Sequence, residues 1–183
     1  MNSLKLLLNK RTSDNIQITY CNHKSNPCWT VTDDKLVKPC QVLKKPDIQI
    51  NSNKDEYYTL LLVDPDVPPG ALQAAFIHWM VINIKNDNVR NGVEILPYIG
   101  AGPPKGTGIH RYFFLLFKQD NFYKPDEIMK VKNNHRNKNQ LQIFFQNNIF
   151  QENNLIAKIH FRAEYDDCVP NVHKRVRTGP PSN

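Results

Sequence analysis

The sequence lacks several features that would assign it to a functional class at once. Its 183 residues contain no apolar run of membrane-spanning length, and the apolar stretch 4–8 is too short for a signal-peptide core. No Asn-x-Ser/Thr glycosylation acceptor occurs. The four cysteines show no Cys-x-x-Cys spacing, which argues against a zinc or redox motif. We interpret them as reduced structural thiols, and these absences together favour a cytoplasmic protein.

The composition is that of a globular protein with one domain over residues 1–183. Hydrophobic residues make up 40% and aromatic residues 10%, which argues against a disordered chain. The net charge of +7 admits nucleic acids or anionic membranes as partners. However, much of the positive charge lies in an Asn/Lys-rich insert at 130–139 and a basic tail at 173–183, without interleaved aromatic residues. We interpret the insert as a solvated loop and expect no nucleic-acid partner.

Strands dominate the predicted secondary structure. Apolar and β-branched patterns predict strands at 16–20, 56–64, 76–84, 109–117 and 155–165. Helical spacing of apolar residues predicts a helix at 139–150, and 3–10 is a candidate for another. This order favours a mainly β fold, an antiparallel β-sandwich with a few peripheral helices.

The segment GAGPPKGTGIH, residues 100–110, contains four glycines around one lysine and ends in a histidine. It is not a nucleotide P-loop, because Lys105 precedes a glycine and an apolar strand follows where a helix is required. Glycine amides in such a loop can still approach an anion closely. Along the following strand His110 and Tyr112 share one face.

Four segments together resemble the phosphatidylethanolamine-binding protein family, which includes the Raf kinase inhibitor protein. They are LLLVDPDVP, IHWMVINI, YIGAGPPKGTGIHRYFFLLFKQ and FRAEYDDCVP, in this order. The resemblance runs from about residue 14 to the C-terminal tail. It implies that the Asp-Pro-Asp segment and the Gly/Pro loop form two walls of a small anion pocket, with a C-terminal helix near its mouth.

The resemblance also implies the residues of this pocket. Two imidazoles and a phenol would donate hydrogen bonds to a phosphate, glycine amides would face it, and prolines would form rigid walls. The expected ligand-binding residues are Asp64, Asp66, Pro68, His78, Tyr98, Gly100, Gly102, Pro104, His110 and Tyr112, with Phe76 and His173 at the mouth. For Asp66 we favour an ion pair with Arg111 over ligand contact. Binding of a phosphate should improve on mild acidification, as the histidines gain charge.

Two backbone features and one departure follow from the same resemblance. Relatives hold the proline that corresponds to Pro68 in cis, so the Val67–Pro68 bond is expected to be cis. A further cis bond would fall at Ala74–Ala75. Many relatives carry Arg-Glu-Trp where this chain has Ala74, Ala75 and Phe76, so its ligand preference is expected to differ.

The resemblance implies a non-enzymatic protein that needs no cofactor and no metal. Its expected ligands are phosphate monoesters or phospholipid head groups of the phosphatidylethanolamine type, and its expected partners are protein kinases. The basic tail adds contact with an anionic membrane surface as a further expectation. The alternative is a metal- or histidine-dependent hydrolase that uses the same pocket.

Overall fold

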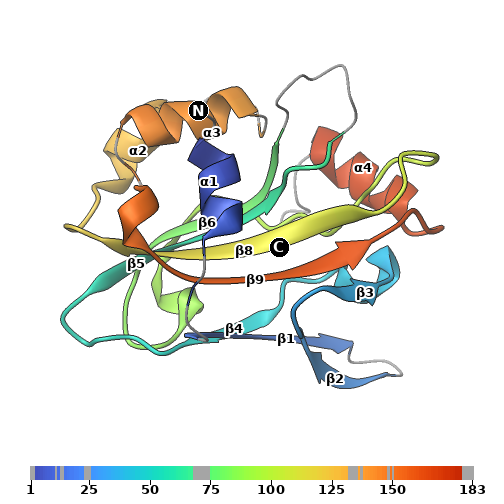
Figure 1. Cartoon of the computed structure of the whole chain (residues 1–183), viewed down its shortest axis with the longest axis horizontal. Helices are drawn as coiled ribbons and strands as arrows, with labels where there is room; N and C mark the ends of the chain where they lie inside the picture. The colour runs from blue at the N-terminus through green and yellow to red at the C-terminus, as the bar shows by residue number, and fades with distance from the viewer. Residues whose placement is uncertain are drawn as a thin grey trace.

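The larger of two β-sheets runs through the middle of the molecule (Figure 1). In spatial order it contains β3 (Lys35–Val37), β9 (Leu155–Ala163), β8 (His110–Gln119), β5 (Tyr57–Asp64), β6 (Phe76–Ile84) and β7 (Val93–Leu96). Neighbouring strands are antiparallel except β3 and β9, which are parallel. This computed structural model describes residues 3–10, 12, 15–22, 26–67, 75–131, 136, 138–147, 149 and 151–178.

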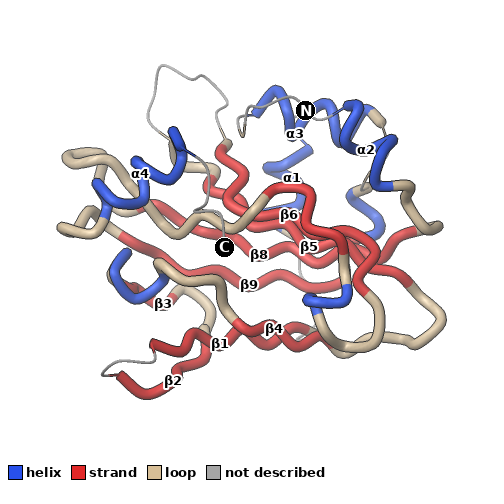
Figure 2. The backbone as a smooth tube through the Cα atoms, turned by 180° about the vertical axis from the view of Figure 1, so that it is seen from behind, coloured by secondary structure: helices blue, strands red, loops and turns tan. Residues whose placement is uncertain are grey.

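A smaller antiparallel sheet packs against one face of the larger one. Its strands are β2 (Asn26–Thr30), β1 (Ile16–Asn22) and β4 (Asp47–Ile50). The other face of the large sheet is covered by α1 (Ser3–Asn9), α2 (Pro125–Val131) and α3 (Lys138–Gln146), whereas α4 (Val169–Thr178) lies apart from them at one end (Figures 1 and 2). The described residues also include three short 3-10 helices. Two of them, η1 (Pro39–Val42) and η2 (Val89–Asn91), lie between strands, and η3 (Glu152–Asn154) lies between α3 and β9.

Alternate side chains of the central strands contribute to two hydrophobic cores. On β5, Leu60 and Leu62 belong to the core between the two sheets, while Leu61 and Val63 belong to the core under the helices. Burial on both faces explains why β5 and β8 are continuous apolar runs in the sequence rather than alternating ones. The predicted β-sandwich with peripheral helices is confirmed.

Most predicted elements are present, and several smaller ones were not predicted. Each of the five predicted strands matches an observed strand to within a few residues. The predicted helix at 139–150 corresponds to α3, and the candidate helix at 3–10 corresponds to α1. The strands β2, β3, β4 and β7 were missed because they are short and depend on pairing with neighbouring strands. The seven-residue helix α2 was also missed.

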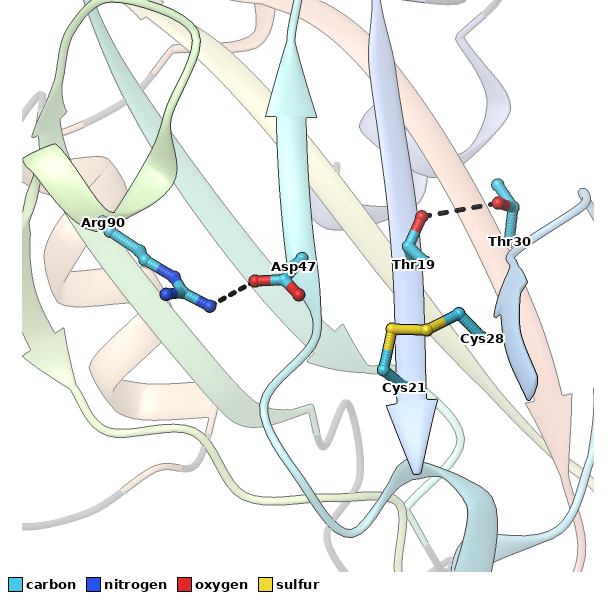
Figure 3. The surroundings of a disulfide bond; sticks show 6 residues. All are labelled: Thr19, Cys21, Cys28, Thr30, Asp47 and Arg90. Atoms are coloured by element: carbon cyan, nitrogen blue, oxygen red, sulfur yellow. Dashed lines mark hydrogen bonds and ion pairs between the residues drawn. A yellow bond between two sulfur atoms is a disulfide. The ribbon is translucent and has the colours of Figure 1, made fainter. Parts of the chain in front are cut away.

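The prediction of reduced cysteines is wrong. A disulfide between Cys21 and Cys28 joins β1 to β2, beside the Thr19–Thr30 hydrogen bond (Figure 3). A second disulfide joins Cys40 in η1 to Cys168, which lies directly before α4, across 128 residues of sequence. Spacing along the chain could not reveal these pairs, because the fold alone brings them together.

Several expectations fall on residues that the structure does not describe, and one concerns membrane-spanning helices. Residues 68–74 are not described, so Pro68, Ala74 and the expected cis bonds at Val67–Pro68 and Ala74–Ala75 lie outside the described residues. Residues 179–183 of the basic tail also lie outside them. Among the described residues, no helix has both the length and the apolar character needed to cross a bilayer.

Candidate ligand-binding site

A cavity of about 210 Å³ lies where β5 ends and where β6 and β8 begin, and α4 forms part of its lining. Figures 1 and 2 show α4 beside the loop that leads into β8. The cavity is lined by Asp64, Val67, Phe76, His78, Gly102, Pro104, His110, Val172, His173 and Val176. It therefore brings together seven of the residues expected from the sequence, from four separate segments.

A buried hydrogen-bonded chain forms the floor of the cavity. Asp64 and His110 are 3% and 1% exposed, and Asp64 Oδ2 lies 2.8 Å from His110 Nδ1. His110 Nε2 lies 2.9 Å from the hydroxyl of Thr107, which donates to the carbonyl of Pro104 at 2.8 Å. The second carboxylate oxygen of Asp64 accepts the backbone N–H of Asp66 at 2.7 Å. Each polar atom of the pair thus has a partner, which fixes both side chains in one position.

Two glycines of the Gly/Pro loop allow Thr107 to join these hydrogen bonds. Gly106 and Gly108, on either side of it, have φ values of +83° and +79°. This left-handed backbone strongly favours glycine. The loop therefore turns tightly enough for the Thr107 hydroxyl to reach His110, a contact that the sequence did not reveal.

His78 lies at an irregularity of β6. The register of β5 and β6 shifts between Leu62, opposite Trp79, and Val63, opposite Ile77, so His78 is the additional residue. Such bulges redirect a side chain, and here the ring contacts the rings of Phe76 and Tyr112, with centroids 4.8 and 5.1 Å away. His78 Nδ1 lies 3.0 Å from the carbonyl oxygen of Ile99.

His78 is neutral at physiological pH. Burial lowers the pKa of its imidazole to about 4, against a smaller opposing effect of the Asp64 carboxylate. The sequence-based expectation that both histidines would gain charge on mild acidification is therefore not met by His78.

Tyr112 lies behind the cavity rather than on its surface. Its side chain is completely buried, and its hydroxyl accepts the backbone N–H of Gly102 at 3.3 Å. Burial and the nearby Asp64 carboxylate raise the pKa of this phenol well above its usual value, so it remains protonated. The Gly102 amide that was expected to face a ligand is thus already bonded to Tyr112.

Tyr98 and Gly100 stabilise the fold instead of lining the cavity. The Tyr98 hydroxyl donates to the carbonyl of Val42 at 2.7 Å and lies 3.1 Å from the hydroxyl of Tyr20. A Cβ on Gly100 would lie 2.5 Å from the same Val42 carbonyl oxygen, so only glycine allows η1 to approach this closely. Neither residue is among those that line the cavity.

The expected ion pair of Asp66 with Arg111 is confirmed. The two carboxylate oxygens accept from Arg111 Nε and Nη2 at 2.8 and 2.7 Å, and the Arg111 backbone N–H also donates to Asp66. Partial burial raises the pKa of Asp66, but the hydrogen bonds from Arg111 outweigh this effect and lower it overall. Asp66 fixes the segment after β5 and does not line the cavity.

One wall of the cavity is α4, and several contacts hold it in place. Val172, His173 and Val176 line the cavity. His173 Nε2 donates to the carbonyl of Gly102 at 2.9 Å, and the Arg175 guanidinium donates to the carbonyl of Leu43 at 2.9 Å. The C-terminal helix implied by the resemblance is therefore present, and it closes the cavity mainly with valines.

The start of α4 is tied to η1. Besides the Cys40–Cys168 disulfide, the carboxylate of Asp166 accepts the backbone N–H groups of Cys40 and Cys168 at 3.0 and 2.9 Å. Among the described residues, Cys40, Asp166 and Cys168 are also the single group with three metal-ligating side chains near one another, but both sulfurs are in the disulfide.

Arg136 was not recognised as structurally important from the sequence, where it lies in the Asn/Lys-rich insert. Its side chain is partly buried and donates to the carbonyls of Ile77, His78 and Pro97 at 2.8–3.2 Å. Its own carbonyl accepts the N–H of Ile77 at 2.6 Å. Arg136 thus supports the backbone that carries His78, and at this residue the insert is packed on the protein rather than solvated.

The fold and the cavity define a β-sandwich with a ligand-sized cavity at one end, closed by a C-terminal helix. The profile of the phosphatidylethanolamine-binding protein family matches residues 30–160. This match covers more than half of the chain, and the chain therefore belongs to the phosphatidylethanolamine-binding protein family.

Individual relatives differ in the functions that their names state. "Putative odorant-binding protein A5" of Drosophila melanogaster is 25% identical over 146 residues, which is 79% of this chain and 70% of the relative. A carboxypeptidase Y inhibitor, solved with its cognate proteinase, has a TM-score of 0.65 and 22% identity over 82% of this chain and 83% of its own. The phosphatidylethanolamine-binding protein of Plasmodium vivax has a TM-score of 0.64 and 20% identity, over 86% and 88%. At these identities the two solved structures support the fold alone.

Proposed function

We propose that this protein binds the head group of a small phosphorylated amphiphile, a phosphate monoester or a head group of the phosphatidylethanolamine type, and does not transform it. The observation that carries this proposal is the cavity, in which the buried residues Asp64, His78 and His110 face a space enclosed by α4. Its volume of about 210 Å³ is below the ~300–1,000 Å³ of sites for drug-sized ligands. A head group fits this space, whereas acyl chains would lie outside it.

Basic residues that neighbour the lining residues Pro104 and His173 in sequence support binding of an anionic group at the mouth of the cavity. Lys174 is exposed and Arg175 is partly exposed on α4, and Lys105 is exposed in the Gly/Pro loop. His173 lies on the cavity surface itself. Cations at the mouth favour a phosphate at that position over a phosphate deep in the cavity, beside the carboxylate of Asp64.

A hydrolase is the second candidate, because Asp64, His110 and Thr107 form the acid–imidazole–hydroxyl order of a nucleophilic triad. Two observations favour binding over hydrolysis. The Thr107 hydroxyl donates to Pro104, and the nearby Gly102 amide, which could stabilise an oxyanion, is bonded to Tyr112. Esterase or phosphatase turnover by the pure protein that disappears in Thr107→Ala would establish the hydrolase instead.

The disulfides bear on where the protein acts. Disulfides persist in oxidising compartments and are rare in the cytosol, so Cys21–Cys28 and Cys40–Cys168 favour an oxidising compartment over the cytoplasm predicted from the sequence. In such a compartment a cytosolic kinase would not be a partner. Exposed Lys174 and partly exposed Arg175 of α4 support contact with an anionic membrane surface rather than with a kinase.

Calorimetric titration with 2-aminoethyl phosphate tests the proposal. Wild-type protein should bind it, and Val176→Trp, which fills the mouth of the cavity from an exposed position, should weaken binding at least tenfold. Met129→Trp on α2 is the matched control, because Met129 is similarly exposed and does not line the cavity. If Val176→Trp binds as wild type does, the ligand site lies elsewhere on the protein.

A further inference from the structure

A second cavity lies between the two sheets. It has a volume of about 240 Å³, and its lining comes from β4, β6, β7 and η2 and from the segment before β4. Within the described part of the chain it shares no lining residue with the cavity beside α4. Its apolar lining is formed by Pro46, Ile48, Trp79, Val81 and Val89.

Trp79 gives this second cavity an aromatic wall. The residue is 3% exposed and belongs to the core between the sheets. Its Nε1 donates to Glu94 Oε1 at 2.6 Å, and Tyr98 packs edge-on against the indole, with centroids 5.6 Å apart. An apolar cavity of about 150 Å³ is sufficient for benzene, so the volume of about 240 Å³ admits one aromatic ring with a short side chain.

Two ion pairs lie beside this apolar wall. Lys45 Nζ lies 2.9 Å from Glu94 Oε1 and 5.6 Å from the centroid of the Trp79 ring. The Arg90 guanidinium pairs with Asp47 at the start of β4 (Figure 3). The side chains of Lys45 and Arg90 are 50% and 77% exposed, and ion pairs at such positions contribute little to stability. Both cations can therefore exchange their carboxylate for another anion at low cost.

The charges that line the second cavity favour an anionic ligand. Lys45, Arg90 and Glu94 line it, so two cations stand against one carboxylate. Glu94 already accepts from Trp79 and from Lys45 through Oε1. A ligand cation would meet two like charges, whereas a ligand carboxylate would meet two charged hydrogen-bond donors.

We infer that the second cavity is a binding site for a small aromatic carboxylate of about the size of phenylacetate. The ring of the ligand lies against Trp79 between the sheets, and its carboxylate accepts from Lys45 and Arg90. This site goes beyond the proposed head-group binding, because it takes a different ligand and uses different residues.

Three ligands of nearly one shape test which charge is recognised. Phenylacetate is an anion, 2-phenylacetamide is neutral and 2-phenylacetamidine is a cation. In calorimetric titrations with wild-type protein, phenylacetate should bind about tenfold more tightly than the amide, because its carboxylate gains charge-assisted hydrogen bonds. The amidine should bind most weakly. Equal binding of the acid and the amide, or tighter binding of the amidine, would overturn the inference.

Three variants locate the site. Lys45→Gln/Arg90→Gln should abolish the preference for phenylacetate over the amide. Lys44→Gln/Lys54→Gln is the control, because it removes the same charge from exposed residues that do not line the second cavity, and it should retain the preference. Val176→Trp, which fills the cavity beside α4, should bind phenylacetate as wild type does. Loss of phenylacetate binding in Val176→Trp would overturn the inference.

Trp79 also provides a direct signal. The chain has two tryptophans, so Trp29→Phe leaves Trp79 as the single indole. Phenylacetate should change the fluorescence of this variant over the same concentrations at which it binds in the calorimeter. Binding without a change in fluorescence would overturn the inference, and so would the absence of binding. Neither result would affect the proposed head-group binding, which the titration with 2-aminoethyl phosphate tests separately.

Discussion

The Cys40–Cys168 disulfide should contribute more to stability than the Cys21–Cys28 disulfide. It closes a loop of 128 residues, whereas Cys21–Cys28 closes a loop of 7. In the chain-entropy treatment, a cross-link stabilises the folded state by restricting the unfolded chain, and the effect increases with loop length. This gives about 5 kcal/mol for Cys40–Cys168 and about 2 kcal/mol for Cys21–Cys28 as upper estimates.

Two double variants compare these links directly. Cys40→Ser/Cys168→Ser should unfold at a clearly lower guanidinium concentration than Cys21→Ser/Cys28→Ser, with far-ultraviolet circular dichroism as the signal. Binding should also respond, because α4 forms one wall of the cavity and begins directly after Cys168. The long-loop variant should bind 2-aminoethyl phosphate more weakly, and the hairpin variant should bind it as wild type does.

Two results would refute this reasoning. If both double variants lose the same stability, loop length does not govern the contribution of these disulfides. If the long-loop variant binds the ligand as tightly as wild type, the hydrogen bonds of Asp166, His173 and Arg175 are sufficient to hold α4, and the disulfide does not shape the cavity.

Three further predictions concern single residues. Stability should fall as pH decreases from ~6.5 towards 4, by at most about 3 kcal/mol, because the unfolded chain binds a proton that buried His78, with its pKa lowered to about 4, does not; His78→Phe should flatten this decline in denaturation measured across that range. Asp66→Asn should cost ~0.5 kcal/mol at neutral pH and nothing at strongly acidic pH, because the lowered pKa of Asp66 stabilises the folded state only above the unfolded-state value of ~3.9; equal cost at both pH values would contradict this. Gly102→Ala should destabilise the protein by about 1–3 kcal/mol and weaken ligand binding, since its Cβ would lie 2.9 Å from Val172 Cγ1 on α4, whereas Gly106→Ala, with open space around it, should cost ~1 kcal/mol and leave binding unchanged.

The sequence predicted the centre of the fold well because the central strands are long and apolar. β5, β6 and β8 are buried on both faces, so burial and β-propensity agree along their whole length. The short strands β3 and β4 have three and four residues, and their pairing depends on strands far away in sequence. Local pattern therefore could not identify them.

The sequence predicted which residues gather at the cavity better than what each of them does. The motif placed Asp64, His78 and His110 together, and they line one cavity. It did not reveal that His78 is neutral, because that state follows from its burial and from the contact with Ile99.

The structural roles of Thr107 and Arg136 depend on tertiary contacts in the same way. Thr107 reaches His110 only because two glycines adopt positive φ, and Arg136 comes from a segment that resembles a solvated loop in the sequence. Three valines of α4, Val169, Val172 and Val176, have helical spacing in the sequence. This spacing indicates a helix with one apolar face, a signal that the sequence-based prediction did not use.

A crystal structure of the protein with 2-aminoethyl phosphate would test the central claim most directly. The account predicts the ligand in the cavity beside α4, with its phosphate at the mouth near His173. A ligand bound outside this cavity would contradict the account.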